Sequence, residues 1–347
     1  MYALILAGGF ATRLWPVTRD FPKPLLPLGK KRIIEFTLEK IDRLQCIGKI
    51  YISTNRAFEK YFKDWFASSN CLKDKSRYQL IIEPSIREDA KFGAIRGIHY
   101  DLKRILRNSP ARDTLIVAGD NIASIDFESF LAFYRRVRNP VVAVFEVNSL
   151  EAMKGLAEVH LDENNKIIDF IEKPKEPKSR LAATAIYVLP KDMTHLIGKY
   201  LKERRNPDAP GYFFEWLSKR YDVYAYKFDG YWFDIGSLEG YLLALNKLLS
   251  ESYVNPDAQI EGKIINPVYI EVNAKVDSKS VVGPYAIIGA NTIVSGSEIR
   301  NSLIMSGSIV NSSSIRNSII GNNAQITGGR IHGSILSSYT RLNITQE

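Results

Sequence analysis

Residues 6–27 hold the first group of side chains that could do chemistry. Gly8 and Gly9 follow a short apolar run, and Arg13 comes soon after them. Adjacent glycines let the backbone approach a ligand closely with positive φ angles. Backbone N–H groups in such a turn bind phosphate oxygens, and a guanidinium adds a fork of donors that matches phosphate. We therefore predict a nucleotide-binding segment with contacts from Leu6, Ala7, Gly8, Gly9, Thr12 and Arg13.

A lysine between two prolines follows this segment. Pro22 and Pro24 hold Lys23 on a stiff piece of chain. Such stiffness suits a point charge that must reach a phosphate. A lone loop lysine is more often a solvated surface residue, and the glycine spacing fits neither the P-loop nor the dinucleotide fingerprint. Lys23 is thus predicted as a phosphate ligand only in combination with Gly8, Gly9 and Arg13.

Four segments together resemble the signature of the sugar-1-phosphate nucleotidylyltransferases. They are Leu-Ala-Gly-Gly-x-x-Thr-Arg-Leu at 6–14, Pro-Lys-Pro at 22–24, Gly-Asp-Asn at 119–121 and Trp-x-Asp-x-Gly at 232–236. The resemblance covers nearly the whole chain and is specific for the superfamily. The combination of these motifs with a repetitive C-terminal part is most similar to the long form of the glucose-1-phosphate thymidylyltransferases.

The resemblance implies roles for particular side chains. Asp120 and Asp234 would bind the catalytic Mg²⁺, which typically takes one or two carboxylates together with phosphates and water. Glu172 would accept hydrogen bonds from sugar hydroxyls. The predicted catalytic residues are Arg13, Lys23, Asp120, Lys173 and Asp234. The predicted sugar-phosphate ligands are Gly155, Glu172, Lys173, Thr184 and Trp232.

The choice of base depends on Glu83, which stands where thymidylyltransferases often have glutamine, and on Gly93. A glutamine donates and accepts, which suits thymine or uracil, whereas an ionised Glu83 only accepts. Guanine, with two adjacent N–H donors, suits a carboxylate better. Residues 92–95 also resemble the stretch where guanylyl and uridylyl relatives read the base. Similarity of the C-terminal part favours dTTP, and these local features favour GTP.

Up to about residue 250, strand-like and helix-like patterns alternate. Strands are expected at 3–7, 49–53, 79–82, 114–118, 141–145, 182–189 and 223–226, and helices at 33–44, 94–106, 129–137 and 238–249. This alternation predicts an α/β layered domain over residues 1–250, with a mainly parallel mixed sheet. The resemblance makes it a Rossmann-like nucleotidyltransferase domain.

After residue 255 an aliphatic side chain recurs every five or six positions. The register runs through Ile264, Ile270, Val276, Val282, Ile288, Val294, Ile299, Ile304, Val310, Ile315, Ile320, Ile326, Ile331 and Leu336. No α-helix has this period, but a β-solenoid places one aliphatic residue per side in its core. Resemblance to hexapeptide-repeat proteins implies a left-handed parallel β-helix over residues 256–347.

Composition excludes several other classes. The net charge is +9, but the 47 lysines and arginines are spread along the chain, so we expect no nucleic-acid partner. No apolar run is long enough for a membrane span, and the first residues resemble a buried strand rather than a signal peptide. The two cysteines show no metal or disulfide spacing. We expect a cytoplasmic protein that forms a homo-oligomer through its β-helix.

The predicted activity joins a nucleoside triphosphate to a sugar 1-phosphate, with dTTP and glucose 1-phosphate as the first choice. The alternatives are a mannose-1-phosphate guanylyltransferase and a UTP-glucose-1-phosphate uridylyltransferase. A non-catalytic sensor of nucleotide sugars is the alternative from another class. A weak acyltransferase activity of the solenoid would need a histidine base, and His332 is the one histidine in that part.

Overall fold

The structure, a computed structural model, describes residues 1–344. The chain forms two compact units, which are described separately. Residues 1–9 and 34–232 form the first, called the sheet unit. Residues 10–33 and 233–344 form the described part of the second, called the solenoid unit. The predicted division at residues 250 and 256 stays a prediction, and its last residues, 345–347, lie outside the described residues.

The sheet unit is built on a mixed sheet whose main path is β10-β9-β11-β6-β1-β4-β5, with β8 and β12 paired beside β11. Strands β6, β1, β4 and β5 run parallel, and β11 runs antiparallel to β6, β8 and β9. The strands are β1 (Tyr2–Leu6), β4 (Lys49–Asn55), β5 (Tyr78–Glu83), β6 (Thr114–Ala118), β8 (Val141–Glu146), β9 (Ala157–Leu161), β10 (Ile167–Glu172), β11 (Leu181–Leu189) and β12 (Tyr224–Lys227).

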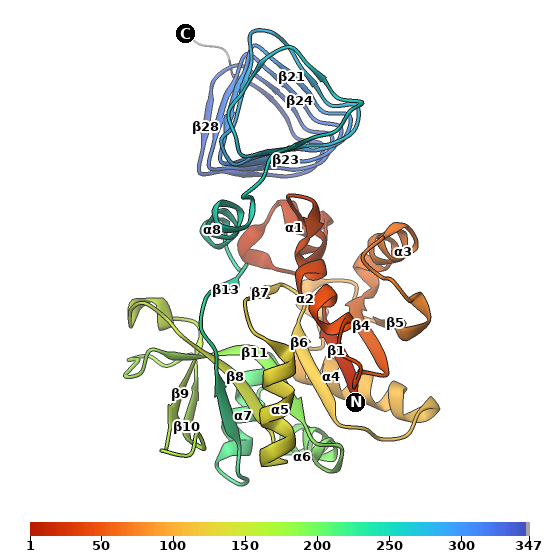
Figure 1. Cartoon of the computed structure of the whole chain (residues 1–347), viewed down its shortest axis with the longest axis vertical. Helices are drawn as coiled ribbons and strands as arrows, with labels where there is room; N and C mark the ends of the chain where they lie inside the picture. Colours follow the sequence, from red (N-terminus) through yellow and green to blue (C-terminus); the bar gives the residue numbers. More distant parts are fainter. Residues whose placement is uncertain (345–347) are drawn as a thin grey trace. The chain divides into compact units, whose positions relative to one another are not determined.

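Helices cover both faces of this sheet (Figure 1). One core joins the apolar faces of α4, α6 and α7 to strand residues such as Leu4, Ile116 and Val142. On the opposite face, Phe130 of α5 packs against Tyr226 of β12, with ring centroids 5.5 Å apart. The helices are α2 (Ile33–Asp42), α3 (Glu59–Ser68), α4 (Ala94–Asn108), α5 (Phe127–Val137), α6 (His195–Lys202) and α7 (Pro210–Ser218).

Every strand and helix predicted in the sheet unit is present, with shifts of one or two residues at the ends. The mainly parallel mixed sheet is therefore confirmed. Helices α3, α6 and α7 were not predicted. In α7 almost every residue is apolar or buried, so its sequence has no polar face to reveal a helical period.

The solenoid unit contains a left-handed parallel β-helix with three sheets, seen end-on as a triangle in Figure 1. The first sheet has β14 (Tyr253–Val254), β17 (Val268–Ile270), β20 (Ala286–Ile288), β23 (Ser302–Ile304), β26 (Ile319–Ile320) and β29 (Ile335–Leu336). The second has β15 (Gln259–Ile260), β18 (Lys275–Val276), β21 (Ile293–Ser295), β24 (Ile309–Asn311), β27 (Gln325–Thr327) and β30 (Arg341–Asn343). The third has β16 (Lys263–Ile264), β19 (Val281–Val282), β22 (Glu298–Arg300), β25 (Ser314–Arg316) and β28 (Arg330–His332).

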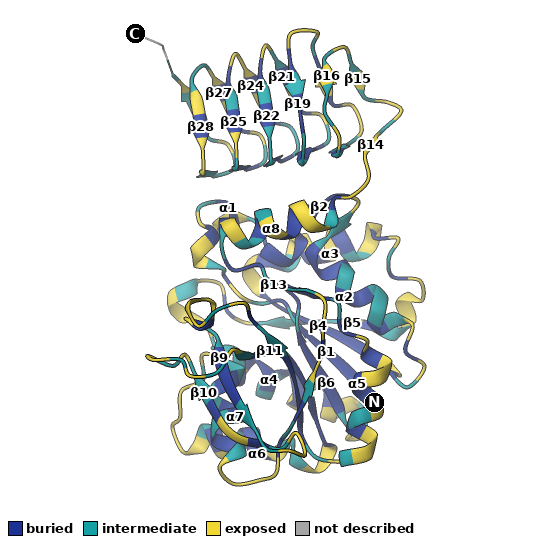
Figure 2. Ribbon diagram, turned by 60° about the vertical axis from the view of Figure 1, so that its left-hand side comes forward, coloured by how far each residue is buried: buried dark blue, intermediate teal, exposed yellow. Residues whose placement is uncertain are grey.

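The aliphatic register predicted from the sequence is the core of this β-helix. All fourteen predicted positions belong to one apolar cluster, fully or partly buried, and Figure 2 shows buried residues along the successive coils. Serine hydroxyls link successive coils at the corners. Ser308, for example, donates to the carbonyl of Gly321 at 2.9 Å and accepts from the Ala324 N–H at 3.2 Å. The β-helix therefore fills its interior with aliphatic side chains and closes its corners with hydrogen bonds.

The rest of the solenoid unit is a short loop-rich segment and one helix. The loop-rich segment contains the 3₁₀ turns η1 (Thr12–Leu14) and η2 (Lys23–Leu25), helix α1 (Val17–Asp20) and the hairpin of β2 (Pro27–Leu28) and β3 (Lys31–Arg32). The hydroxyl of Tyr241 in α8 (Leu238–Leu248) donates to the Pro27 carbonyl at 2.6 Å. This buried bond ties α8 to the segment that carries Arg13 and Lys23.

Within residues 1–344, no helix has the length and apolar character that a membrane crossing requires. Cys46 and Cys71 are both free thiols.

Candidate active site

The segment after β1 lies at the carboxyl edge of the parallel strands. The N–H of Ala7 donates to the Ser53 carbonyl at 2.7 Å, and the Asn55 side-chain amide donates to the Gly8 carbonyl at 2.8 Å. On the other side, the N–H of Gly119 donates to the Leu6 carbonyl at 2.8 Å. Leu6, Ala7 and Gly8 are thus fixed between the ends of β4 and β6, at the edge where open α/β sheets bind ligands.

Asp120 follows β6 directly beside this segment. Its carboxylate accepts a hydrogen bond from the Asn121 amide at 3.0 Å, and the amide oxygen of Asn121 accepts one from the Trp232 indole at 2.6 Å. Asn121 is buried, which fixes the direction of the amide. Trp232, predicted as a sugar-phosphate ligand, therefore orients Asp120 through Asn121.

Glu83 ends β5 and faces the loop after β1. A Cβ at Gly8 would lie 3.3 Å from Glu83 Oε1, and the Ser53 hydroxyl donates to the same oxygen at 2.9 Å. Burial raises the pKa of Glu83, and the Ser53 hydrogen bond opposes this shift. The predicted base reader is thus placed next to the predicted phosphate loop.

Gly93 precedes α4 with a φ of 76°, and a Cβ there would lie 2.7 Å from the Pro207 carbonyl. Positive φ and close approach both require glycine. The first N–H groups of α4, from Ala94 and Ile95, donate to the carbonyls of Asp208 and Pro207. Gly93 therefore fixes the entry to α4, and its contact with a nucleotide stays a prediction.

Glu172 and Lys173 lie at the end of β10, which β9, β11 and β6 separate from β1 in the sheet. Burial raises the pKa of Glu172 to about 7, against the lowering effect of Lys173 and with a further rise from Glu215. A Cβ at Gly211 in α7 would overlap Glu172 Oε2. The backbone N–H of Glu172 donates to Glu215 at 3.2 Å. Glu172 is therefore held against the first turn of α7, while Lys173 is exposed.

The remaining sugar-phosphate candidates differ in exposure. Gly155 is exposed, with a φ of 87°. Thr184 is fully buried, and its hydroxyl donates to the Ala143 carbonyl at 2.9 Å. Gly155 is open to a ligand, whereas the hydroxyl of Thr184 holds β11 to β8. Their contacts with a sugar phosphate stay predictions.

In the solenoid unit, Arg13 lies beside Asp234. The guanidinium Nη2 is 3.9 Å from Asp234 Oδ2, and the Arg13 side chain is 70% exposed. A Cβ at Gly236 would overlap this guanidinium, so the glycine of the Trp-x-Asp-x-Gly motif makes room for Arg13. The exposed Thr12 begins η1 next to Arg13.

Lys23 also belongs to the solenoid unit, and it is only 6% exposed. The alternative of a solvated surface lysine is therefore wrong. Pro22 and Pro24 on either side are buried as well. A lysine that is buried on a proline-stiffened turn has a restricted position, as a residue that must meet a phosphate requires.

The donors predicted for the metal fit Mg²⁺ by their chemistry. Asp120 and Asp234 are both partly exposed, and each offers hard carboxylate oxygens. Asp120 lies in the sheet unit and Asp234 in the solenoid unit. Within residues 1–344 no group of three or more His, Cys, Asp or Glu side chains could hold a metal, so the proposed ion would depend on phosphate and water for its other ligands.

Several polar residues of the site region were not predicted from the sequence. They are Ser53 and Asn55 in β4, Asp101 in α4, and Glu215 in α7. Asp101 could have been found, because it is an acid on the same helical face as the buried Ile98, Leu102 and Ile105. The others carry no local signal, since serine, asparagine and glutamate are common near strand and helix ends.

Family models cover most of the chain. A model described as nucleotidyl transferase matches residues 2–251, and a model described as the GMPPB C-terminal domain matches residues 264–343.

Curated relatives are similar over the same part. A protein of Fusobacterium nucleatum named glucose-1-phosphate adenylyltransferase is 30% identical over 263 residues, which span 72% of this chain and 67% of the relative. A protein of the same name from Clostridium acetobutylicum is 28% identical over 263 residues, with the same shares.

Two solved structures have a similar fold. A UDP-glucose pyrophosphorylase in complex with UDP-glucose has a TM-score of 0.59 at 24% identity, covering 71% of this chain and 98% of that one. A putative glucose-1-phosphate thymidylyltransferase from Bacillus anthracis, in complex with a sucrose, has a TM-score of 0.60 at 22% identity, covering 74% and 98%. At these identities the similarity concerns the fold alone.

Proposed function

Since the chain belongs to the nucleotidyl transferase family, we propose that it joins dTTP to glucose 1-phosphate, giving dTDP-glucose and pyrophosphate. The family assignment makes it a sugar-1-phosphate nucleotidyltransferase, whose substrates are a nucleoside triphosphate and a sugar 1-phosphate. The observation that carries the proposal is the arrangement at the carboxyl edge of the sheet. There the Gly8–Gly9 segment lies between Glu83 and Asp120.

The proposed reaction is one in-line displacement. An oxygen of the sugar 1-phosphate forms a bond to the α-phosphorus, and the bond from that phosphorus to the bridging oxygen of pyrophosphate breaks. The electron pair leaves with pyrophosphate, and no protein nucleophile takes part. Positioning and charge neutralisation then carry the catalysis.

The nucleotide is assigned to the glycine segment and two cations. The N–H groups after β1 would bind the phosphates, and Arg13 would contact the β- and γ-phosphates. Lys23, held on its buried turn, would neutralise charge at the α-phosphate. Two highly charged anions repel each other, so cations near both are a physical requirement of this reaction.

We also propose that Asp120 and Asp234 hold Mg²⁺. Asn121 and Trp232 orient the Asp120 carboxylate. Mg²⁺ held by these two carboxylates would supply positive charge to the phosphates, which would favour departure of pyrophosphate.

The sugar 1-phosphate is assigned to the end of β10. The exposed ammonium of Lys173 would bind its phosphate, while Glu172 would accept hydrogen bonds from its hydroxyls. The curated relatives are named glucose-1-phosphate adenylyltransferases, which supports glucose as the sugar.

Two other nucleotides have specific support. The curated relatives are named adenylyltransferases, which supports ATP. Glu83 beside Gly8 supports GTP when its carboxyl is ionised, because a carboxylate accepts from both N–H groups of guanine. The support for dTTP is the resemblance of the sequence motifs and the repetitive C-terminal part to the long-form thymidylyltransferases, although the family model that matches residues 264–343 is described as the GMPPB C-terminal domain.

A panel of substrates tests the proposal. Pyrophosphate release is measured with dTTP, UTP, GTP, CTP and ATP, each with glucose 1-phosphate and mannose 1-phosphate. The proposal expects the highest kcat/KM for dTTP with glucose 1-phosphate. A higher value for another pair would replace that substrate assignment. Nucleotide-sugar binding without any pyrophosphate release would instead support the sensor alternative.

Two further assignments are part of the proposal. The free thiols of Cys46 and Cys71 suit a reducing cytoplasm. Association of β-helices would give a homo-oligomer, which light scattering of the full chain would detect. A monomer at micromolar concentration would contradict it.

A further inference from the structure

Helix α4 carries an acid on its buried face. Asp101 is 0% exposed, and within residues 1–344 neither of its carboxylate oxygens has a hydrogen-bond partner. An ionised carboxylate in such a place would cost several kcal/mol. Burial raises the pKa of Asp101 well above its usual range, and the charge of Glu83 raises it further. These surroundings favour the protonated form of Asp101.

The nearest polar groups form a small cluster with Asp101. The Ser53 hydroxyl donates to Glu83 Oε1 at 2.9 Å, and Ser53 also lies near enough to Asp101 to lower its pKa. Ser53 is fully buried, so its hydroxyl is shielded from water. A protonated Asp101 has one O–H to donate, and the oxygen of Ser53 is an available acceptor. Donation there would orient the Ser53 hydroxyl toward Glu83.

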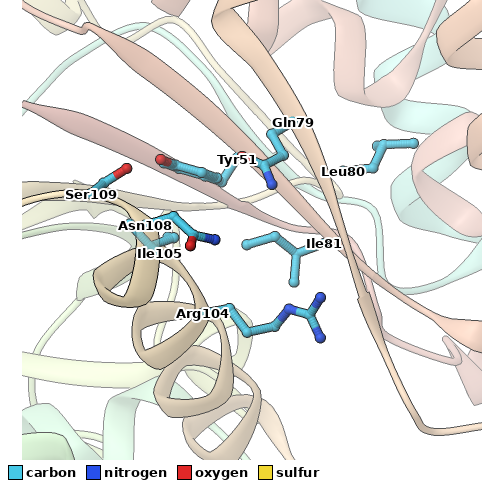
Figure 3. A pocket seen from close by; sticks show the side chains of 8 residues that line it. All are labelled: Tyr51, Gln79, Leu80, Ile81, Arg104, Ile105, Asn108 and Ser109. Carbon is cyan, nitrogen blue, oxygen red and sulfur yellow. The ribbon is translucent and has the colours of Figure 1, made fainter.

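The charges around the cluster are few. In the described part of the chain, no hydrogen bond or ion pair joins Glu83 to a cation. Arg104 of α4 lowers the pKa of Asp101. Its guanidinium donates to the Tyr100 hydroxyl at 2.8 Å and extends toward β5 beside Ile81, along a cavity of about 60 Å³ (Figure 3). The polar neighbours that affect the titration of Glu83 are therefore Asp101 and Ser53.

Glu83 is the titratable group of this cluster that lies next to the ligand loop, and Ser53 is joined to the loop through its backbone carbonyl, which accepts from the Ala7 N–H. A Cβ at Gly97 of α4 would lie 3.0 Å from Glu83 Oε1 and 3.2 Å from Oε2, and a Cβ at Gly8 would lie 3.3 Å from Oε1. The two glycines leave room for the carboxyl between α4 and the loop. Glu83 is partly exposed, whereas Asp101 and Ser53 are buried. A base at this loop would meet Glu83 first.

We propose that Glu83 is a proton-dependent base reader and that Asp101 is a positioning residue, which acts through Ser53 to set the pH at which Glu83 ionises. The ionised form accepts two hydrogen bonds and suits guanine, which presents two adjacent N–H donors. The protonated form donates one and accepts one, which suits thymine, uracil or adenine. This inference rests on the proposed function, in which Glu83 reads the base.

The test is the ratio of kcat/KM for GTP to that for dTTP, measured with the full chain between pH 5.5 and 8.5. The ratio cancels effects of pH on the phosphates, the metal and the sugar phosphate. We expect it to rise with pH, by up to about tenfold per pH unit where Glu83 loses its proton. In Glu83→Gln, which mimics the protonated acid, the ratio should be flat and should favour dTTP.

Two variants at position 101 separate positioning from packing. Asp101→Asn can still donate to Ser53, so the pH midpoint of the ratio should stay within about 0.3 units of wild type. Asp101→Leu removes the donor, and Ser53→Ala removes the relay, so both midpoints should rise by at least about half a unit. Should Asp101→Leu fail to fold, Ser53→Ala carries the same expectation.

A flat ratio in the wild type, an unchanged slope in Glu83→Gln, or an unmoved midpoint in Ser53→Ala would overturn the inference. Failure of the proposed function is a different result, because no nucleotide would then release pyrophosphate. In that event the same pH series is measured as the ratio of dissociation constants for GTP and dTTP by calorimetry. A ratio of dissociation constants that depends on pH would then support the inference, and a ratio that does not would overturn it.

Discussion

Asp277, which follows β18 in the β-helix, and Glu172, the last residue of β10, are both acids at strand ends, but their surroundings shift the pKa in opposite directions. Hydrogen bonds from Ser280, Ser295 and the Gly296 N–H lower the pKa of Asp277 to about 2. Burial raises the pKa of Glu172 to about 7. The β-helix surrounds its acid with donors, whereas the sheet edge buries an acid against α7.

This difference distinguishes an acid that stabilises the fold from acids of the kind found at functional sites. A carboxylate that receives several hydrogen bonds stabilises the fold and stays charged. An acid without enough donors costs stability, and such groups concentrate at functional sites. Glu172, Glu83 and Asp101 all belong to the sheet unit, and burial raises the pKa of each of them. The comparison therefore places the acids with raised pKa values in the sheet unit and indicates a structural role for Asp277 in the β-helix.

The largest expected effect is on catalysis by the two aspartates assigned to the metal. Asp120→Asn and Asp234→Asn should each lower pyrophosphate release at least about 100-fold, because a neutral amide binds Mg²⁺ poorly. Their melting temperatures should stay close to wild type. Asp277→Asn is the matched control in the β-helix and should retain activity. Near-normal turnover in both site variants would remove the metal assignment.

Truncation of a core side chain in the β-helix should instead lower stability and leave catalysis nearly unchanged. Ile315 in β25 is 0% exposed, and Ile315→Ala should lower the free energy of unfolding by about 2–4 kcal/mol. Chemical denaturation followed by circular dichroism measures this change. The kcat of the folded protein should change less than about twofold, because no predicted site residue lies on β25. A large loss of kcat at unchanged stability would contradict a structural role for this coil.

The pH dependence of sugar-phosphate binding should follow Glu172. If its ionised form accepts the sugar hydroxyls, KM for glucose 1-phosphate should fall up to about tenfold between pH 6 and 8. In Glu172→Gln this part of the pH dependence should vanish, which also corrects for titration of the substrate. Equal profiles for wild type and variant would exclude Glu172 as the titrating group.

The raised pKa of Glu172 also determines how the stability of the fold depends on pH. The unfolded chain loses the Glu172 proton near pH 4.5 and the folded chain near 7. Stability should therefore fall as pH rises between these values. Asp277 is the opposite case, because its lowered pKa contributes stability above pH 3.8 that is lost as pH falls toward about 2. Denaturation of Glu172→Gln and Asp277→Asn across these windows should show opposite slopes relative to wild type.

The smallest expected effect concerns the serine corners of the β-helix. Ser308→Ala removes a donor to Gly321 and an acceptor for Ala324, and should cost about 1–2 kcal/mol of unfolding free energy. Ser312, whose side chain lies at an exposed position, is the matched control, and Ser312→Ala should cost less than about 0.5 kcal/mol. Equal losses in both variants would show that the buried corners add nothing specific.

Local patterns in the sequence were sufficient to predict the elements that repeat or that are formed by residues close together in the chain. The period of five and six identified the β-helix because each coil contacts its neighbours in the same way. The Gly8–Gly9 pair after a strand indicated a phosphate segment because both the strand and the turn are local. The stiff setting of Lys23 was likewise visible, since its two prolines adjoin it.

The environment of each acid depended on contacts between distant segments. Glu172 is partly buried because Gly211 leaves space for its carboxyl, and Asp120 is oriented because Trp232 reaches Asn121. Neither contact has a signal in the surrounding sequence.

The sequence by itself therefore determined the fold class, the β-helix and which residue types could bind a triphosphate. Only the tertiary structure decided that Glu83 shares a buried cluster with Ser53 and Asp101. The reason is physical: a residue's type fixes which protons it can hold, but the protonation state depends on burial and neighbouring charges. Folding brings those charges together from strands and a helix far apart in the chain.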